Sequence, residues 1–207
     1  MKIRHFQEVT STNEVAKQYL EDGTVIVADT QTRGRGRHAR TWHSPQGGLW
    51  CSIVIQHAPA PVLNLAAALA VTKAFEQNGL KTRLKWPNDV LVDGKKICGI
   101  LSETEGDFMI IGVGVNLNNK DFPEDIAGTS FVTETGTEID RMEFLSAFLD
   151  VFNTIKEQAF LKEYKKYSST IGSKVMVKNG REITGTAVDV DEKGRLVLQL
   201  ENGKEMK

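Results

Sequence analysis

The run Phe108-Met109-Ile110-Ile111-Gly112-Val113-Gly114-Val115 is apolar over nearly its whole length. Its isoleucines and valines favour a strand, and a near-continuous apolar strand is typically buried on both faces. Turn signals precede it at Glu105-Gly106-Asp107 and, earlier, at Asp93-Gly94. Residues 80–117 therefore predict consecutive strands, with residues 108–115 covered on both sides.

The chain before this region predicts helices and strands in alternation. Ser11 and Glu14 have the spacing of a capping box, so we expect a helix over residues 12–22 that stops at a glycine. A long helix is expected over residues 61–79, because proline stands at its start and glycine at its end. Strands are expected at residues 24–28 and 49–56.

The chain after residue 117 begins with a polar segment, 118–139, which predicts a loop. Asp140 and Glu143 form a second capping signal, and apolar residues then recur at helical spacing up to about Tyr167. We therefore expect one helix to fill that stretch.

The last part of the chain changes to short strands, expected at residues 174–178, 182–190 and 195–200. Turn signals such as Lys193-Gly194 and Asn202-Gly203 separate or follow them, which predicts a small, barrel-like all-β module. The boundary is placed near residue 170, giving domains 1–170 and 171–207.

The composition is that of an ordinary globular protein: 207 residues, a formal net charge of −1 and 40% hydrophobic residues. Near-neutral charge argues against a general nucleic-acid coat protein. The N-terminus lacks the apolar segment of a signal peptide, and no stretch is long and apolar enough to span a bilayer. Two cysteines, Cys51 and Cys98, make neither a disulfide framework nor a metal cluster. We expect a cytoplasmic protein without membrane contact.

The densest chemistry lies at residues 31–43, Gln31-Thr32-Arg33-Gly34-Arg35-Gly36-Arg37-His38-Ala39-Arg40-Thr41-Trp42-His43. Arginines bind phosphate and carboxylate oxygens in pairs, and glycines let backbone N–H groups approach an anion. The run fits a solvated surface loop, a nucleic-acid contact or a site for a small anion such as a nucleoside triphosphate. Trp42 could stack on a base or anchor the loop in the core.

Two later motifs carry polar groups next to strands. In Lys85-Trp86-Pro87-Asn88-Asp89, the amide and carboxylate either form a turn or hold a ligand or Mg²⁺. In residues 95–101, strict alternation places Lys96, Cys98 and Ile100 on one face and Ile97, Gly99 and Leu101 on the other. Lys96 either extends to solvent or enters a pocket. Cys98 is expected to be a buried filler rather than a nucleophile.

Gly112 and Gly114 do not have the spacing of a dinucleotide-binding fingerprint, and no helix follows them directly. Glycines in a buried strand indicate either tight packing or room for a flat ligand.

The order of these motifs closely resembles that of biotin–protein ligases. The resemblance rests on five segments spread over about residues 1–170: Ser11-Thr12-Asn13, Gly34-Arg35-Gly36-Arg37-His38-Ala39-Arg40, Lys85-Trp86-Pro87-Asn88-Asp89, Lys96-Ile97-Cys98-Gly99-Ile100-Leu101 and Gly112-Val113-Gly114-Val115-Asn116. It implies an α+β fold of the class II synthetase type, with a mixed sheet, flanking helices and a small C-terminal SH3-like β-barrel.

The resemblance also implies an activity in two steps. Biotin and ATP give biotinyl-5′-AMP and pyrophosphate, and the biotinyl group then passes to a lysine of a biotin carboxyl carrier domain. Cations are needed because a carboxylate must attack a phosphate, and Mg²⁺ would assist on the phosphates. The loop would be disordered without ligand and would close over the adenylate.

The site residues implied by the resemblance fall into groups. Biotin would be bound by Ser11, Thr12, Gln31, Gly34, Arg35, Arg37, Lys96, Gly99 and Gly114. ATP would be bound by Arg40, Trp42, Asn88, Asp89 and Asn116. Arg37 and Lys96 would be catalytic, and Asp89 would hold the metal, whereas Arg33 receives no role.

Two departures from the family pattern shape our expectations. The ligase motifs begin close to Met1, so we expect a monofunctional ligase without a DNA-binding domain. The small β module ends at a hairpin turn and is expected to be shortened. A homodimer is possible by analogy. The alternatives are a lipoate–protein ligase or octanoyltransferase of the same fold, and a non-enzymatic anion- or nucleic-acid-binding module.

Overall fold

The computed structural model describes residues 1–207 except 57–59, 124–126, 157–158 and 180. Within the described residues, seven strands form one sheet in the order β1-β2-β3-β7-β6-β5-β4. β1 and β2 are parallel and the remaining pairs are antiparallel, so the sheet is mixed. The strands are β1 (Lys2–Val9), β2 (Thr24–Gln31), β3 (Leu49–Gln56), β4 (Arg83–Lys85), β5 (Asp89–Val92), β6 (Lys95–Glu105) and β7 (Phe108–Val115).

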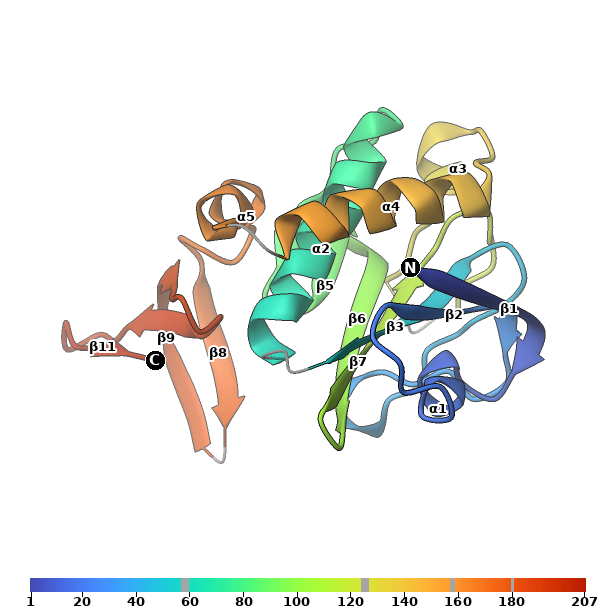
Figure 1. The fold of residues 1–207 in the computed structure, drawn as a ribbon. Helices are drawn as coiled ribbons and strands as arrows, with labels where there is room; N and C mark the ends of the chain where they lie inside the picture. Colours follow the sequence, from blue (N-terminus) through green and yellow to red (C-terminus); the bar gives the residue numbers. More distant parts are fainter. Residues whose placement is uncertain (57–59, 124–126, 157–158, 180) are drawn as a thin grey trace.

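Strand β7 confirms the prediction for residues 108–115. It lies between β3 and β6, and its two faces contribute to two separate hydrophobic clusters. One face packs under helices α2 (Ala60–Gln77) and α4 (Arg141–Ile155), which cross in front of the sheet in Figure 1. Short helix α1 (Thr12–Ala16) packs on the other face, where Ala16 meets Ile110.

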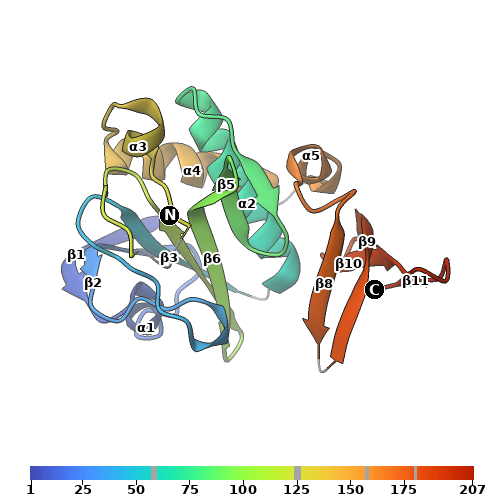
Figure 2. The same ribbon diagram turned by 180° about the vertical axis from the view of Figure 1, so that it is seen from behind.

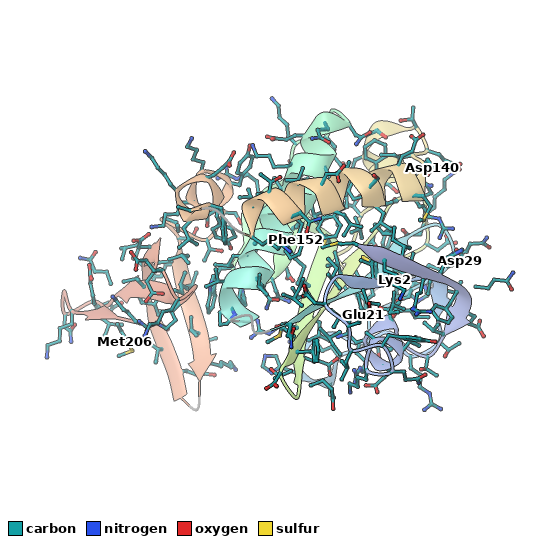
Figure 3. The ribbon with its side chains drawn as sticks, viewed as in Figure 1. Lys2, Glu21, Asp29, Asp140, Phe152 and Met206 are labelled. Atoms are coloured by element: carbon teal, nitrogen blue, oxygen red, sulfur yellow. The ribbon has the colours of Figure 1, made fainter. Side chains whose placement is uncertain are left out.

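Helix α4 is fixed at its start and along its length. The Asp140 carboxylate accepts hydrogen bonds from the backbone N–H groups of Met142 and Glu143, as the capping signal predicts. Figure 3 shows Asp140 at the beginning of this helix and Phe152 farther along it; Phe152 is fully buried. Arg141 donates to Asp29 at 2.8 Å and so ties the helix to β2.

Three helix predictions need correction. The helix over residues 12–22 is confined to α1, because tighter i to i+3 turns follow Ala16. Within the described residues the Ser11 side chain does not cap α1. Residues 118–139 contain helix α3 (Phe131–Thr135), capped by Ser130 and ended by left-handed Gly136.

The helix expected up to about Tyr167 is two helices. Helix α4 ends at Ile155, and α5 (Leu161–Tyr167) follows as a separate element. Periodicity could not reveal the break, because apolar residues continue at similar intervals on both sides of it.

The C-terminal part forms a four-stranded antiparallel sheet in the order β11-β10-β9-β8, beside α5 in Figures 1 and 2. Its strands are β8 (Lys174–Asn179), β9 (Arg181–Val190), β10 (Leu196–Gln199) and β11 (Glu205–Met206). Ala187, Leu196 and Leu198 join the hydrophobic cluster that also contains the main sheet. The predicted α+β class with a small all-β C-terminal module is therefore confirmed.

The part of the chain that the structure describes contains no helix long and apolar enough to cross a membrane.

Candidate active site

A cavity of about 990 Å³ opens on the α1 side of the main sheet. One wall is the segment 34–42, which we call the arginine hairpin, and the other is formed by β5, β6 and β7, which we call the sheet wall. All the residues that the resemblance assigns to the site line this cavity except Gly34 and Asn116. The structure therefore brings the predicted site residues together in one cavity, and their roles there remain predictions.

The arginine hairpin is held by a small backbone ladder. The N–H of Gly36 donates to the carbonyl of Arg40 at 2.7 Å, and the N–H of Trp42 donates to the carbonyl of Gly34 at 2.9 Å. A Cβ atom on Gly34 would lie 2.3 Å from the Trp42 carbonyl oxygen. Gly34 thus serves the close approach of the two hairpin arms rather than the cavity surface.

The tip of the hairpin is strained. His38 and Ala39 have φ angles of 56° and 57°, in the left-handed region. A residue with a Cβ atom is disfavoured there by roughly 1–2 kcal/mol. The surrounding contacts must therefore hold the tip in place.

Arg35 supplies one such contact. Its guanidinium lies 2.6 Å from the carboxylate of Glu14 and 2.7 Å from that of Glu103. Arg37 reaches the opposite wall, where it donates to the Asn88 side-chain oxygen at 3.1 Å. The hairpin is therefore tied both to α1 and to the sheet wall.

The position of Lys96 corrects the predicted alternation. The pairing of β5 with β6 shifts register between Val90 and Leu91, so that Val90 faces Cys98 and Leu91 faces Lys96. This β-bulge leaves Ile97 without a partner on β5 and turns Lys96 to the same side as Gly99. A Cβ atom on Gly99 would lie 3.0 Å from Lys96 Cε. Lys96 therefore enters the cavity instead of extending away from the Gly99 face.

The backbone of Lys96 is fixed on both sides. Its N–H donates to the carbonyl of Ala127 at 2.8 Å, and its carbonyl accepts from Thr129 at 3.0 Å. Buried Asn116 supports this segment by donating its side-chain amide to the Thr129 carbonyl at 3.0 Å. Asn116 thus lies behind the Lys96 backbone and does not line the cavity.

The side chain of Lys96 pairs with Asp89. Lys96 Nζ lies 2.6 Å from Asp89 Oδ1. Both side chains are less than one-third exposed. A carboxylate and an ammonium thus face the arginine hairpin across the cavity.

Trp42 lies flat against the sheet wall. A Cβ atom on Gly114 would be 2.5 Å from Trp42 Nε1, and one on Gly99 would be 2.9 Å from Cζ3. Lys96 Nζ lies 5.1 Å from the centroid of the indole. The two glycines therefore accommodate a flat aromatic group, and in this structure that group is the indole of Trp42.

The end of the cavity near α1 is a hydrogen-bonded network of neutral side chains. Gln31 Oε1 accepts from the N–H of Thr12 at 2.8 Å, and its amide donates to Ser44 at 2.8 Å. The Ser52 hydroxyl donates to the Asn13 side-chain oxygen at 2.6 Å and lies 2.7 Å from the Thr12 hydroxyl. Such a network orients amide and hydroxyl groups to recognise an uncharged polar ligand group.

Comparison with known proteins identifies this arrangement. Residues 5–116 match the model of the biotin/lipoate A/B protein ligase family, and residues 170–207 match the biotin protein ligase C terminal domain. The chain belongs to the biotin/lipoate A/B protein ligase family.

Three relatives show how far the likeness to this ligase family extends. The bifunctional ligase/repressor BirA of Bacillus spizizenii is 34% identical, over 96% of this chain and 70% of that protein. The biotin–[acetyl-CoA-carboxylase] ligase of Mycobacterium tuberculosis is also 34% identical, over 86% of this chain and 74% of that protein. The structure of a biotin protein ligase from Aquifex aeolicus in complex with biotin and ATP superposes with a TM-score of 0.92 at 33% identity, covering 99% of this chain and 95% of that one.

Asn13 and Glu103 are site residues that the sequence did not reveal. Asn13 donates to Glu103 at 2.6 Å, and the same carboxylate oxygen accepts from Arg35. Glu103 stands on β6 two residues after the ligase motif that ends at Leu101, and no sequence signal marks it. Asn13 belongs to the Ser11-Thr12-Asn13 motif and lies in α1, but its partners Ser52 and Glu103 stand on β3 and β6.

Asp89 is the residue that the family resemblance assigns to Mg²⁺, and its surroundings show whether it could hold that ion. Asp89 is a carboxylate in the cavity lining, and its Oδ1 atom lies 2.6 Å from the Lys96 ammonium. No group of three or more metal-binding side chains occurs in the described ranges. Because Mg²⁺ is usually held by one or two carboxylates together with substrate phosphates, a single carboxylate fits that ion.

Both cysteines are buried thiols. Burial raises the pKa of the Cys51 thiol to about 12 and raises that of Cys98 as well. The thiolate is the reactive form of cysteine, and the raised pKa values keep both thiols protonated near neutral pH. The prediction that Cys98 is a buried filler is confirmed.

Proposed function

We propose that this chain is a biotin–protein ligase that forms biotinyl-5′-AMP and transfers the biotinyl group to a lysine of a biotin carboxyl carrier domain. The observation that carries the proposal is the pairing of the arginine hairpin with Lys96 and Asp89 across one cavity in a chain of this family. The named relatives and the solved ligase with biotin and ATP support the same reaction.

In the first step, a biotin carboxylate oxygen bonds to the α-phosphorus of ATP. The bond from that phosphorus to the bridging oxygen breaks, and pyrophosphate leaves with its electron pair. Two anions must meet, so positive charge must already stand where the new bond forms. Lys96 lines one wall of the cavity and Arg37 the other, which supports a catalytic role for both.

The remaining residues would bind and orient. The Thr12–Gln31–Ser52 network suits the neutral ureido end of biotin, and Arg35 would lie over the ligand. Arg40 and Asn88 line the part of the cavity assigned to the phosphates. When bound, Mg²⁺ would neutralise phosphate charge, and Asp89 is the side chain that would hold it.

In the second step, the amine of the carrier lysine attacks the acyl carbon of the adenylate, AMP leaves, and the amine loses a proton. The name of the mycobacterial relative points to a carboxylase as the carrier's parent enzyme. Because the adenylate is a mixed anhydride, the hairpin and Trp42 would shield it from water until the carrier arrives. The reaction needs intracellular ATP, so we propose the cytoplasm as its compartment.

The test is to incubate the protein with biotin, ATP and Mg²⁺ and to detect biotinyl-AMP by mass spectrometry, with lipoate in a parallel reaction. We expect biotinyl-AMP in the reaction with biotin and no lipoyl-AMP in the reaction with lipoate. Lipoyl-AMP in preference to biotinyl-AMP would assign the chain to the lipoate branch. The absence of any adenylate would contradict the ligase assignment and leave the octanoyltransferase and the anion-binding module.

A further inference from the structure

Trp86 belongs to a ligase motif, yet its polar contacts run to the C-terminal part of the chain. Its indole Nε1 donates to the carbonyl of Gly194 at 3.0 Å. Its backbone N–H donates to the Thr170 hydroxyl at 2.9 Å. The side chain is half-buried and packs on the main hydrophobic cluster. Trp86 therefore connects the corner between β4 and β5 to the small sheet.

The acceptor carbonyl lies in a rigid turn between β9 and β10. Asp191 Oδ1 accepts from the N–H groups of Lys193 and Arg195, and Oδ2 accepts from the Arg195 guanidinium at 2.9 and 2.7 Å. The hydrogen bonds from Arg195 lower the pKa of Asp191 to about 2, so the carboxylate is charged at neutral pH. Gly194, at φ +75°, lies against Pro61 near the start of α2. The turn thus holds the Gly194 carbonyl in a defined place.

On its other side, Trp86 is joined through Pro87 to the phosphate-facing residues. Asn88 donates to the carbonyl of Ile100 at 2.9 Å and accepts from Arg37. Asp89 pairs with Lys96. Trp86 and Pro87 also line the cavity, so a shift of Trp86 would change the cavity wall at the place where Asn88 and Asp89 stand.

The preceding strand gives this corner little support of its own. β4 has three residues and lies at the edge of the main sheet. Its outer side is covered by the segment that leads to the small sheet, where Ser169 donates to the carbonyl of Leu84 at 2.8 Å and Arg83 donates to that of Ser168 at 2.9 Å. The corner is thus fixed mainly by contacts with the C-terminal part.

We propose that Trp86 is a positioning residue, held by the Asp191–Arg195 turn, that sets Asn88 and Asp89 for the ATP phosphates. This inference rests on the proposed ligase function and extends it. The turn of the small sheet would support the residues that bind ATP. The ureido end of biotin would bind at the α1 end of the cavity, which lies apart from this connection.

The test compares Trp86→Phe with Asp191→Ala, which loosens the turn without touching the cavity. Loss of one hydrogen bond predicts that each variant raises the KM for ATP in adenylate formation about fivefold to tenfold. The biotin dissociation constant should change by less than about twofold, on the scale of a surface substitution. The double variant should be no worse than the poorer single variant, because both remove the same connection.

Asp189→Ala is the matched control. Asp189 stands on β9, just before the turn. The substitution likewise removes an ion pair, with Lys165 at 2.6 Å, and a hydrogen bond from a backbone N–H. Among the described residues, no side-chain hydrogen bond or ion pair joins Asp189 to Trp86 or to the Asp191–Arg195 turn, so the KM for ATP should stay at the wild-type value. An equal rise of the KM for ATP in all three variants would show a general loosening of the small sheet and would overturn the proposal.

An NMR readout separates this proposal from the ligase assignment. The chain has three tryptophans, so each indole ¹⁵N–H gives one resonance that can be assigned by substitution. Asp191→Ala should shift the Trp86 resonance, whether or not the protein forms biotinyl-AMP. An unmoved resonance, a normal KM for ATP in Trp86→Phe, or multiplying effects in the double variant would each contradict the proposal. A wild-type protein without adenylation activity would contradict the ligase assignment instead.

Discussion

The sheet wall and the arginine hairpin face each other across the cavity but are built by different means. Lys96 is held by backbone hydrogen bonds to Ala127 and Thr129, and Asp89 stands in register with Gly99 on the next strand. The hairpin has a short ladder, a tip with two left-handed residues and anchors made by charged side chains. The sheet wall is therefore preorganised, whereas the hairpin can be displaced at low energy.

This difference suggests a division of labour. Catalytic electrostatics works best when charges are fixed before the reaction, which suits the sheet wall. Substrate entry and product release need a part that moves, which suits the hairpin. We expect substitutions in the sheet wall to slow the chemical step, and substitutions at the hairpin anchors to change binding and protection.

The largest expected effect in the sheet wall comes from Asp89→Ala. The variant removes the partner of Lys96 and the candidate metal ligand, so single-turnover formation of biotinyl-AMP should fall by about 100-fold or more. Asp107→Ala, at the exposed turn between β6 and β7, is the control and should react like wild type. A rate for Asp89→Ala within about threefold of wild type, a change of under 1 kcal/mol, would place the chemistry elsewhere.

Gly114→Ala addresses the contact between the two walls. The added methyl group would overlap the Trp42 indole, so the indole must move away and both substrates should bind about tenfold more weakly. Isothermal titration calorimetry with biotin, and with ATP, measures this. The double variant with Trp42→Ala should be no worse than Trp42→Ala alone, and additive losses would show that the glycine acts by another route.

Glu103→Gln tests the hairpin anchors with a smaller change. The pair with Arg35 is partly exposed, with 38% and 26% of the two side chains accessible, so it contributes about 0.5–1 kcal/mol. Hydrogen exchange in the hairpin should then accelerate about twofold to fivefold. Glu21→Gln breaks the exposed Lys2–Glu21 pair shown in Figure 3 and should leave hairpin exchange unchanged.

The anchoring of the arginine hairpin through Glu14 should depend least on pH near neutrality. The hydrogen bond from Lys17 lowers the pKa of Glu14, against the opposing effect of burial and with help from Arg35. A carboxyl group whose pKa is lower in the folded than in the unfolded protein stabilises the folded state at pH values above its unfolded pKa, about 4.3 for glutamate. This stabilisation is lost as the pH falls through the folded pKa. The Trp42 indole resonance should therefore be constant from about pH 6 to 9 and shift only in acid. A midpoint near pH 6.5 would implicate a histidine.

The same comparison explains what could be predicted from the sequence. Strand β3 begins and ends where its pattern indicates, and β7 is as buried as its apolar run requires. Local patterns suffice for such elements because burial on a sheet leaves a period in the chain. The lining of the cavity was also predictable, since the ligase motifs converge there.

Features set by contacts between distant strands were not predictable. The β-bulge that turns Lys96 into the cavity has no signal in residues 95–101, because register is decided by the partner strand. Glu103 joins the site only because Arg35 and Asn13 meet it in space. Asn116 and Gly34 were assigned to ligands, yet they support the backbone of the two walls.

The most direct test of the division of labour is the single-turnover rate of biotinyl-AMP formation for Lys96→Met, at saturating biotin and ATP, beside Lys95→Met. Lys95 is the exposed neighbour, with 55% of its side chain accessible, and its variant should react like wild type. Lys96→Met should react at least about 100-fold more slowly while the biotin dissociation constant stays within about threefold of wild type. A near-normal rate for Lys96→Met, or a loss explained entirely by weaker biotin binding, would contradict a fixed catalytic charge on the sheet wall.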